Sequence, residues 1–477
     1  MAQDLREWLA QAEGIGYLKR IDGADWDLEI GAAAALNAKR KNCPALLFDN
    51  VTGYPRGNRV LTNSTSSPNL VALVLDLPQN SSDMELSNAL RQKLPEWDDH
   101  LDQFPPVMVE KGPILENIHS GGEINLFEFP VPRWHELDIG RYIGTASVVI
   151  TRDPDTSQVN LGTYRIMAHN RNTTGFYISP GKHGRIHYEK YHARGERCPV
   201  AISVGHHPLL FRVACIEVAP GSEYNLAGII GREPVRTLTE EVTGLPIPAD
   251  AEIVIAGWCP PGKMLEEGPF GEWTGYYASK ERPAPIIEVE RVYHRNNPIL
   301  LGSHNDLPPH DETYFHVLVK SAMLTNELIQ SGVPDVRGAW LSEAGLYQLI
   351  VVSIKQRYAG HAKQAALLAS QGRVGSYMGR YIIVVDEDID PSDINEVLWA
   401  MCTRSDPEKD IDIIRRTRSS ALDPMIRKPS TAYYNSRAVI DACKPYEWMT
   451  EFPQEIRIDP ELARRVREKW GDILLCQ

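Results

Sequence analysis

Two short segments of this chain carry the residue types that acid–base chemistry needs. In residues 265–277, glycines and a proline predict a turn that leaves Glu267 and Glu272 at its ends, beside a run rich in Trp and Tyr. Residues 160–165 end in Arg165, whose planar guanidinium can hold carboxylates bidentately. An Arg between two Glu suits an acid substrate, because the Arg holds its carboxylate while a buried Glu delivers a proton. The pattern indicates chemistry that resembles decarboxylation, and a structural salt bridge on a solvated turn is the open alternative.

Length, composition and charge narrow the classes of protein. The chain has 477 residues, so we expect two to four domains at about 100 to 200 residues each. With 43% hydrophobic and 24% charged residues it has the composition of a globular protein. The formal net charge of -13 argues against a nucleic-acid partner and against a polybasic membrane contact. A small organic acid can still bind where a local positive site overrides the global field.

Cysteine usage and hydropathy indicate a cytoplasmic protein. The seven cysteines are scattered and form no CxxC pair, which fits reduced thiols better than a disulfide framework or a zinc ribbon. No apolar run approaches the roughly 18 residues that a membrane span needs, and the N-terminus reads as an amphipathic helix rather than a signal peptide. We therefore expect a cytosolic protein with no membrane contact.

The elements around the two segments predict an α/β multidomain protein. Residues 17–21 and 45–48 read as strands with an Ala-rich helix, 30–38, between them, which predicts an N-terminal α/β region over 1–115. From 116 to 305 strands dominate and helices are scarce, which predicts a mostly antiparallel, barrel-like domain. Its expected strands are 146–150, 160–168, 200–204, 253–257 and 286–289.

The C-terminal third has a different pattern. Residues 306–340 are predicted as a linker whose helix covers 311–330, and 341–477 as a second α/β domain. In that domain a β-α-β unit is expected, with strands 349–354 and 381–385 around a helix at 362–370. A last helix, 460–470, is predicted to pack on a partner subunit.

Three further patterns resemble metal or cofactor sites, and we favour a structural interpretation of each. The acidic run 386–390 follows a strand, and we favour a solvated loop over a Mg²⁺ site. His183 and His187 have the i, i+4 spacing of a helical zinc pair but lack the HExxH pattern, so a metal-dependent hydrolase is a minor alternative. The GxxGxxxG spacing from Gly372 precedes a strand, whereas a dinucleotide loop follows one, which argues weakly against a Rossmann site.

Four motifs in order resemble a known family, the UbiD-type decarboxylases, which include hydroxybenzoate, vanillate and ferulic acid decarboxylases. The motifs lie at residues 160–165, 222–228, 267–276 and 353–355, and the resemblance runs over nearly the whole chain. It implies an N-terminal α/β region, a central split β-barrel that binds flavin, and a C-terminal α/β domain used for oligomerisation.

The resemblance also implies an activity, a cofactor and partners. The expected reaction is the reversible, non-oxidative decarboxylation of an aromatic, heteroaromatic or α,β-unsaturated carboxylic acid. The expected cofactor is prenylated FMN, made by a partner flavin prenyltransferase, and the expected assembly is a homodimer or homohexamer. The alternative is a non-catalytic flavin-binding subunit of a multi-subunit decarboxylase, which would have no chemical reason to keep Arg165, Glu267 and Glu272 together.

Individual roles follow from the same resemblance. Arg165, Glu267 and Glu272 would form the catalytic network, with Arg165 on the substrate carboxylate and Glu272 as proton donor. A Mn²⁺ or Mg²⁺ ion would be held against the cofactor phosphate, and a K⁺ ion near Glu223 is a further candidate. The implied metal ligands are Asn160, His183 and Glu223, and the implied cofactor contacts are Thr163, Ile166, Lys182 and Lys355. His187 remains a rival to His183, because the alignment there depends on a gap.

The choice of acid depends on residues 300–307, which we expect to line the pocket. His304 and Asn305 in this segment, together with Lys182, would leave unpaired polar groups against a bare phenyl ring. The sequence therefore predicts a substrate ring that bears a hydroxyl, a ring nitrogen or a second acidic group, in preference to plain cinnamate.

Overall fold

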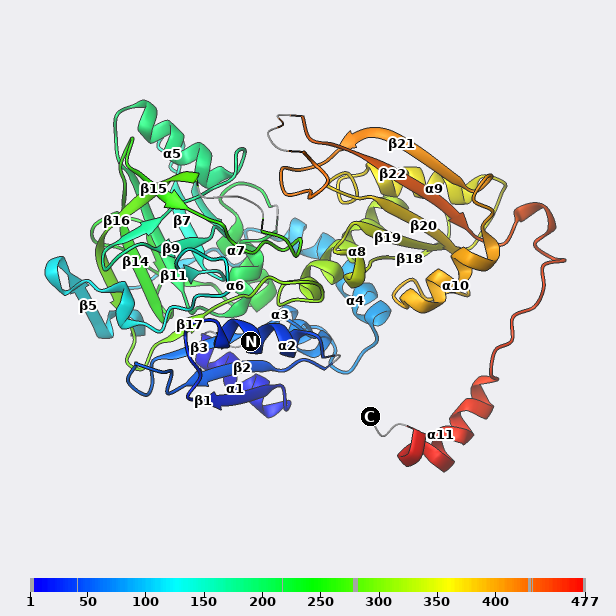
Figure 1. Cartoon of the computed structure of the whole chain (residues 1–477), viewed down its shortest axis with the longest axis horizontal. Coiled ribbons are helices and arrows are strands. Elements are labelled where there is room, and N and C mark those ends of the chain that lie inside the picture. The colour runs from blue at the N-terminus through cyan, green and yellow to red at the C-terminus, as the bar shows by residue number, and fades with distance from the viewer. Residues whose placement is uncertain are drawn as a thin grey trace.

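The computed structural model describes residues 4–40, 42–216, 218–277, 282–427, 430 and 432–474. Figure 1 shows two lobes, with α4 (Asp83–Asp99) and α8 (Thr313–Gln330) lying between them. The first lobe contains the helices and strands from α1 (Leu5–Gly14) to β17 (Ile299–Leu301) apart from α4, and the second contains those from β18 (Val336–Leu341) to β22 (Tyr434–Ala442). The predicted helix at 311–330 is α8. None of the described helices is long and apolar enough to cross a membrane, and the six described cysteines are free.

The first lobe begins with a four-stranded sheet. β1 (Leu18–Asp22) and β2 (Ala45–Asp49) are parallel, with α2 (Glu29–Ala38) between them in sequence, as predicted. β3 (Arg59–Thr62) is antiparallel to β2, and β17 is parallel to β3. The sheet is thus completed by residues 299–301, which the sequence analysis grouped with the barrel. Helices α1 (Leu5–Gly14) and α3 (Pro68–Leu75) also belong to this region.

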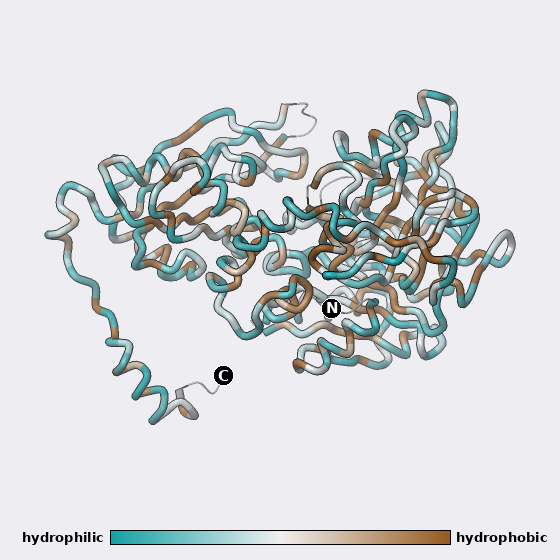
Figure 2. The backbone as a smooth tube through the Cα atoms, turned by 180° about the vertical axis from the view of Figure 1, so that it is seen from behind, coloured by the Kyte–Doolittle hydropathy of each residue, from teal (hydrophilic) through white to brown (hydrophobic). Residues whose placement is uncertain are grey.

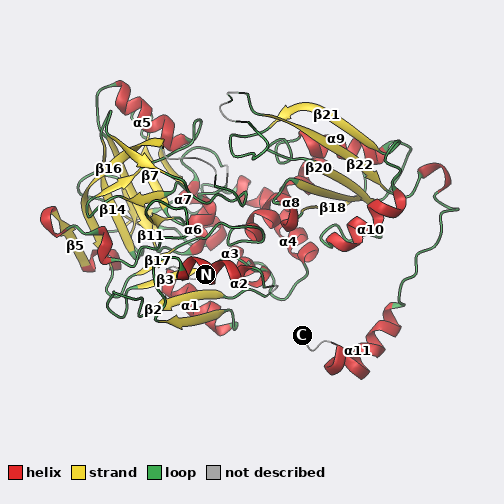
Figure 3. Ribbon diagram, in the orientation of Figure 1, coloured by secondary structure: helices red, strands yellow, loops and turns green. Residues whose placement is uncertain are grey.

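The central sheet is curled and antiparallel. Its eight-strand path runs β6 (Arg141–Gly144), β9 (Ile166–Ala168), β10 (Thr173–Gly175), β16 (Arg282–His294), β14 (Ile253–Cys259), β11 (Cys198–Val204), β7 (Val148–Arg152) and β8 (Val159–Gly162). Two further strands, β15 (Met264–Glu267) and β5 (Asn117–Ser120), pair with β16. Among the described residues the edge strands β6 and β8 do not pair, so the predicted barrel-like domain is a half-barrel and not a closed barrel. Figure 3 shows strands of this sheet, among them β7, β11, β14 and β16, in the first lobe.

Two short connections cross the open seam of this half-barrel. β6 leads into β7 through residues 145–147, and β8 leads into β9 through residues 163–165, although the strands of each pair lie near opposite ends of the path. The sequence predicted one strand over 160–168. The structure divides it, because β8 pairs with β7 whereas β9 pairs with β6 and β10. Arg165 consequently lies in a seam-crossing link.

Helices and small elements surround the half-barrel. A buried cluster that includes Tyr142, Phe176 and Ile202 forms one core of this lobe. The remaining helices and strands of the lobe are α5 (His183–Ala193), α6 (Pro208–Val213), α7 (Glu223–Gly231), β4 (Val107–Met108), β12 (Arg236–Thr239) and β13 (Pro246–Pro248). The 3₁₀ turns of the chain are η1 (Pro113–Glu116), η2 (Gly121–Glu123), η3 (Leu126–Glu128), η4 (Glu343–Gly345) and η5 (Tyr446–Trp448).

The second lobe is built on a five-stranded sheet. Its order is β18 (Val336–Leu341), β19 (Leu349–Ile354), β20 (Tyr381–Asp386), β22 (Tyr434–Ala442) and β21 (Ile411–Arg418). β19 and β20 are parallel and are joined through α9 (His361–Gln371), which confirms the predicted β-α-β unit. Alternate residues of these strands belong to two separate cores: Ile350 and Ile382 pack with residues of α9, and Val351 and Ile383 with residues of α10 (Ile394–Arg404).

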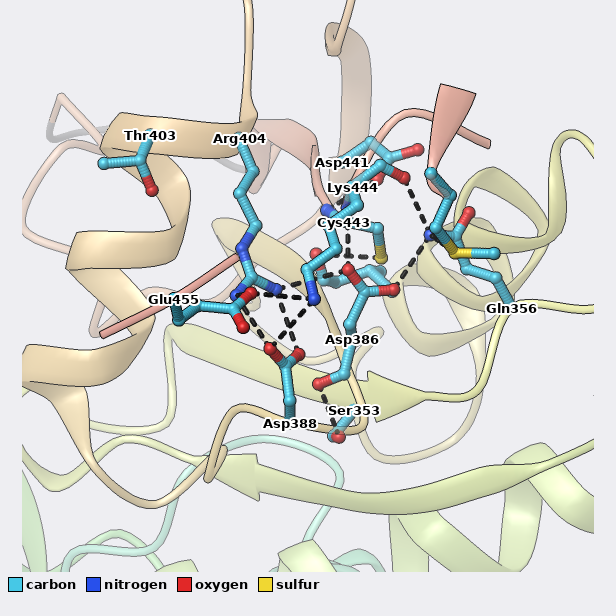
Figure 4. Close-up of polar contacts among 12 residues, drawn as sticks. Ser353, Gln356, Asp386, Asp388, Thr403, Arg404, Asp441, Cys443, Lys444 and Glu455 are labelled. Atoms are coloured by element: carbon cyan, nitrogen blue, oxygen red, sulfur yellow. Dashed lines mark hydrogen bonds and ion pairs between the residues drawn. The ribbon is translucent and has the colours of Figure 1, made fainter. Parts of the chain in front are cut away.

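The acidic run 386–390 is only partly the solvated loop that we favoured, because Glu387 and Asp390 are exposed whereas Asp386 and Asp388 belong to an ion-pair network. Asp386 and Asp388 both bind Arg404 of α10, whose side chain is 0% exposed, at 3.2 and 2.9 Å (Figure 4). Glu455 binds the same guanidinium at 3.0 Å, and Lys444 binds Glu455 at 2.7 Å. Asp386 and Asp388 face inward because Arg404 supplies the counter-charge. The network also ties the segment that follows β22 to this lobe.

The chain ends in α11 (Pro460–Leu474), which lies away from both lobes in Figure 1. In Figure 2 hydrophobic segments gather inside the lobes, whereas the tail is mostly hydrophilic with isolated hydrophobic positions. Those positions include Ile458, Leu462, Trp470 and Ile473, all of which are exposed.

Candidate active site

Arg165 binds both of the predicted glutamates. Its Nε and one terminal nitrogen donate to the two carboxylate oxygens of Glu267 at 2.7 and 2.9 Å. The other terminal nitrogen pairs with Glu272. The Arg165 and Glu267 side chains are 9% and 2% exposed, and that of Glu272 is 17% exposed. The structure thus brings Arg165 together with two glutamates that lie about a hundred positions later in the sequence, and it excludes the alternative of a solvated turn.

Arg165, Glu267 and Glu272 form a triad of ion-paired side chains. Burial and charge shift pKa values within the triad. Burial alone would lower the pKa of Arg165, but the hydrogen bond to Glu267 and the charge of Glu272 raise it above its ordinary value. Burial raises the pKa of Glu272 from its ordinary value, and the positive charge of Arg165 offsets only part of that shift. Arg165 is therefore a fixed cation, and Glu272 is the carboxyl group that retains its proton more readily than a free one.

Local backbone structure positions the two glutamates. Glu267 ends β15 opposite Arg282 of β16. Gly268, with φ of +88°, then starts the turn, a backbone conformation that L side chains rarely adopt. The Glu272 amide donates to the Tyr276 carbonyl at 3.1 Å, and the Gly275 amide donates to the Glu272 carbonyl at 2.9 Å. The turn therefore holds Glu272 by its backbone and leaves its carboxyl group free to meet Arg165.

Aromatic side chains pack against one side of the triad. The Arg165 guanidinium lies 5.1 Å from the Tyr177 ring centroid and 5.2 Å from that of Phe270. The buried Tyr142 hydroxyl donates to Glu267 at 3.4 Å, and its ring packs on Phe270 at 4.4 Å. These contacts exclude water from one side of the triad and strengthen its charge interactions. Sequence reasoning missed Tyr142, which carries no local motif.

Two of the predicted metal ligands, Asn160 and Glu223, are buried beside one phenol. Tyr164 accepts a hydrogen bond from Asn160 Nδ2 at 3.5 Å and one from the Gly184 amide at 3.2 Å. Glu223 begins α7, is 4% exposed, and has one carboxylate oxygen that is buried without a hydrogen-bond partner among the described residues. Burial raises the pKa of Glu223 to about 7. A buried carboxylate of this kind requires a proton or a cation.

The two candidate histidines occupy different positions on α5. His183 begins the helix, is exposed, and adjoins Gly184, whose amide meets the Tyr164 hydroxyl near Asn160. His187 is buried, with Nδ1 at 2.9 Å from Thr151 Oγ1 and Nε2 at 3.8 Å from Asp153. Burial lowers the pKa of His187 to about 4. His187 thus already has partners on β7 and in the loop after it, and the pair does not converge as zinc ligands would.

The predicted cofactor contacts divide into two groups. Thr163 and Ile166 flank Arg165 in the seam, and Lys182 is exposed just before α5. Lys355, by contrast, follows β19 in the second lobe and forms an ion pair with Glu387 at 3.3 Å. The structure therefore brings Thr163, Ile166 and Lys182 to the half-barrel, whereas Lys355 pairs within its own lobe.

The predicted substrate residues meet a histidine that the sequence did not single out. His135 Nε2 lies 2.6 Å from the Asn305 carbonyl oxygen, and its ring is 4.5 Å from that of His304. The same ring is 5.7 Å from Phe270, and a Cβ added to Gly271 would come within 2.6 Å of it. His304 and Asn305 are thereby linked to the turn that carries Glu272. A lone histidine has no sequence signal, since only tertiary contact places it here.

Polar atoms at this position remain without partners. His304 Nδ1 and Asn305 Oδ1 are buried and have no hydrogen-bond partner among the described residues. Burial lowers the pKa of His304 to about 3, so its ring is neutral. For His135, burial would lower the pKa, but the hydrogen bond and charge of Asp138 raise it above the ordinary value. The site therefore combines a neutral histidine with one that favours its charged form.

Comparison with known proteins finds one family over the whole chain. The models for the N-terminal, Rift-related and C-terminal domains of 3-octaprenyl-4-hydroxybenzoate carboxy-lyase (UbiD) match residues 9–90, 107–305 and 313–442. A phenolic acid decarboxylase of Streptomyces sp. (strain D7) is 33% identical over 455 residues, which covers 93% of this chain and 92% of the relative.

Solved structures agree in fold over nearly the full length. The vanillic acid decarboxylase of Sedimentibacter hydroxybenzoicus in its open form is 30% identical, with a TM-score of 0.86 and 99% of both chains covered. An evolved dimeric form of the UbiD-class enzyme HmfF from Pelotomaculum thermopropionicum, in complex with prFMN, is 29% identical, with a TM-score of 0.81 and coverage of 97% and 98%. Together with the matched domains, these likenesses show that the chain belongs to the UbiD family and is a carboxy-lyase.

Proposed function

We propose that this chain decarboxylates an aromatic acid that carries a polar ring substituent, with prenylated FMN as cofactor and with Arg165, Glu267 and Glu272 as the catalytic residues. The observation that carries the proposal is the buried triad, in which one guanidinium meets two carboxylates of unlike surroundings. The reaction is non-oxidative, and we propose that it is reversible, since protonation of the product carbon and its microscopic reverse use the same carboxyl group.

Arg165 would bind the substrate carboxylate. A guanidinium has five N–H donors, of which three are used by Glu267 and Glu272. Two remain for an incoming carboxylate, and the raised pKa keeps the group charged while it is desolvated. Glu267 holds Arg165 in place through two parallel hydrogen bonds, so the carboxylate that departs as CO₂ is oriented before it reacts.

Glu272 would deliver the proton. With both glutamates ionised the buried triad would carry a net negative charge, and a bound substrate carboxylate would add another. Protonation of Glu272 removes that excess, in agreement with its raised pKa. After CO₂ leaves, the Glu272 proton can replace it at the same carbon.

The residues near Asn160 fit a metal-anchored flavin phosphate. The unpartnered, buried oxygen of Glu223 can accept a cation in place of a proton, and Asn160 supplies a second oxygen ligand on the adjoining strand. We propose that Asn160, His183 and Glu223 hold Mn²⁺ or Mg²⁺ there, with Thr163, Ile166 and Lys182 around the flavin. When bound, prenylated flavin supplies the electrophilic ring that accepts the electron pair left by CO₂. A flavin prenyltransferase would supply the cofactor.

Lys355 stays a prediction as a phosphate contact. Its ammonium group is paired with Glu387, so contact with a phosphate would require the exchange of that ion pair. The K⁺ ion near Glu223 likewise stays a prediction.

The test of this function is activity after production together with a flavin prenyltransferase. Such protein should show a modified flavin spectrum and release CO₂ from hydroxylated benzoic or cinnamic acids. Protein that retains stoichiometric prenylated cofactor yet releases no CO₂ from any acid of the panel would favour a non-catalytic subunit. A hydrolase built on His183 and His187 would instead stay active without flavin, and the contacts of His187 disfavour it.

The preference for a polar ring rests on His304 and Asn305, whose unpartnered atoms lie close to His135. A bare ring would leave these atoms unsatisfied at about 1 to 3 kcal/mol each, whereas a ring hydroxyl can bond to them. We expect hydroxylated benzoates or phenolic acids to exceed cinnamate in kcat/KM. His304→Leu should reduce the difference in kcat/KM between the hydroxylated acids and cinnamate. A clear preference of the wild type for cinnamate would contradict the proposal.

A further inference from the structure

A second group of metal-ligating side chains lies at the end of β16 that is distant from the triad. His294 is the last residue of β16, His119 lies on β5, and Glu128 ends η3. β5 pairs antiparallel to β16 with Asn117 opposite His294 and with His119 opposite Val292, so the two histidines are diagonal neighbours on one face. One ligand atom from each of the three residues lies within 4.8 Å of the other two.

The hydrogen bonds of this group prepare His294 to act as a ligand. Its Nδ1 lies 2.9 Å from the Arg295 carbonyl oxygen, a contact in which Nδ1 must donate. That tautomer leaves a lone pair on Nε2, which is buried and has no hydrogen-bond partner among the described residues. Metal-ligating histidines commonly donate their second ring nitrogen to a backbone carbonyl in this way, which fixes the ring orientation.

Glu128 and His119 supply the other two ligand atoms, and no Lys or Arg side chain of the described chain competes with a cation for Glu128. Glu128 Oε1 lies 3.1 Å from His119 Nδ1, and within the described part of the chain this is the only ion pair of Glu128. No Arg or Lys there neutralises the carboxylate, so its charge is available to a cation. The His119 and His294 rings meet edge to face, with centroids 5.0 Å apart. Small side-chain rotations can therefore bring all three ligand atoms around one ion.

We propose that His119, Glu128 and His294 form a second binding site for a divalent cation of the zinc class. Two imidazole nitrogens and one carboxylate oxygen suit Zn²⁺ better than Mg²⁺ or Ca²⁺, which prefer oxygen ligands alone. The side chains of His119 and Glu128 are 28% and 26% exposed, so an ion can enter and a water molecule can take the fourth position. Binding would displace any proton from the imidazole nitrogens that become ligands.

The expected role is a cross-link between η3 and β16. Glu267 pairs with Arg282, twelve residues before His294 on β16. At about 3.3 Å per residue the two sites are about 40 Å apart along the strand. An ion that binds the folded chain but not the unfolded chain raises the melting temperature by mass action. Loss of this site should therefore lower zinc-dependent stability and leave the triad intact.

The experiment adds Zn²⁺ alone to the purified holoenzyme. Zinc retained after gel filtration is counted by mass spectrometry, and Tm is measured with and without the ion. Wild-type protein should retain one more zinc per chain than His119→Ala or His294→Ala, and only the wild type should show the full rise in Tm. Glu128→Gln should retain less zinc than the wild type. His100→Ala removes an exposed histidine outside the group and should match the wild type.

Comparison between variants separates this site from the proposed ligands Asn160, His183 and Glu223, which stay intact throughout. Substitution with Co²⁺ provides a second readout, because a four-coordinate site with two imidazoles should give visible absorption in the wild type that His294→Ala lacks. Equal zinc content and equal Tm shifts in the wild type, His119→Ala and Glu128→Gln would overturn the proposal. Those two positions are partly exposed, so the comparison holds even where His294→Ala does not fold.

Discussion

Arg165 shares one guanidinium between two carboxylates that differ in environment. Glu267 is almost fully buried and takes two parallel hydrogen bonds, with a third from Tyr142. Glu272 takes one contact and is 17% exposed. A carboxylate with three donors is fixed as the partner of Arg165, whereas a carboxyl group with one donor and a raised pKa can exchange its proton. The division of labour within the triad thus follows from the number of donors that each glutamate meets.

Glu272→Gln should lower kcat by about 10²- to 10⁴-fold, the usual contribution of a general acid, because the amide keeps the shape of the side chain but cannot donate the proton. Cofactor content and Tm should be unchanged. Steady-state CO₂ release measures the loss. The control is Glu266→Gln, which alters an exposed neighbour in β15 and should leave the rate as it is. Full activity of the Glu272 variant would remove this residue from the mechanism.

The pH profile should reveal the raised pKa of Glu272. The acid form is the donor, so the rate is present below the pKa of Glu272 and is lost as pH rises through it. Since burial raises that pKa, the basic limb of kcat/KM should lie at higher pH than a free glutamate would give. The residual activity of Glu272→Gln should lack this limb. If the basic limb of the pH profile persisted unchanged in the variant, a group other than Glu272 would be responsible for it.

At the scale of elements, the seam of the half-barrel brings the site residues together. The link 163–165 crosses the gap between β8 and β9, so Arg165 is held at both ends by strands of one curled sheet. The long strand β16 places β15, and with it Glu267, on the same sheet. Sites held by strands are positioned more accurately than sites on free loops. The turn after Glu267 adds Glu272, the residue that we propose as proton donor.

In the second lobe, Arg404 links α10 to the end of β20 and to the segment that follows β22. Arg404→Met should destabilise this lobe by about 3 to 5 kcal/mol, because it leaves Asp386, Asp388 and Glu455 with one cation, Lys444, in place of two (Figure 4). Denaturant unfolding followed by tryptophan fluorescence measures the change. Arg464→Met, which removes two exposed helical ion pairs in α11, should cost less than about 1 kcal/mol.

The same ion-pair network makes the stability of the second lobe depend on pH. Burial would raise the pKa of Asp388, but the hydrogen bond and charge of Arg404 and the charge of Lys444 lower it below its ordinary value. A lowered pKa contributes stability above the unfolded value of about 3.9, and this is lost as pH falls through the folded value. The contribution should be smaller in Arg404→Met, where only Lys444 remains to lower the pKa of Asp388, so equal acid sensitivity of variant and wild type would contradict this account.

At the scale of the whole molecule, α11 is the part of the described chain that lies away from both lobes (Figure 1). Its exposed Leu462, Trp470 and Ile473 would be covered if the helix packed on a second copy. We predict that removal of residues 459–477 lowers the oligomeric state, as measured by light scattering after gel filtration, and leaves the thermal unfolding of the lobes in place. An unchanged mass per particle would mean that α11 is not an assembly element.

The sequence by itself determined the residue types of the proposed catalytic triad and the order of the motifs. Glycines and a proline predict the turn between Glu267 and Glu272, because the backbone preferences of these residues are local. Strong periodicity likewise predicted α8 and the unit β19-α9-β20, because hydrophobic spacing encodes which face of an element is buried. The flavin, the metal and the partner enzyme came from resemblance, since a cofactor site has no local pattern in this chain.

Only the tertiary structure decided which distant segments meet. It split the predicted strand 160–168 at the seam, added β17 to the first sheet, and paired Asp386 and Asp388 of the acidic run with Arg404. It also placed His135 beside Phe270 and brought His119, Glu128 and His294 together. Each of these outcomes depends on pairing between segments far apart in the chain, where the free energy comes from burial and charge neutralisation that neither segment encodes alone.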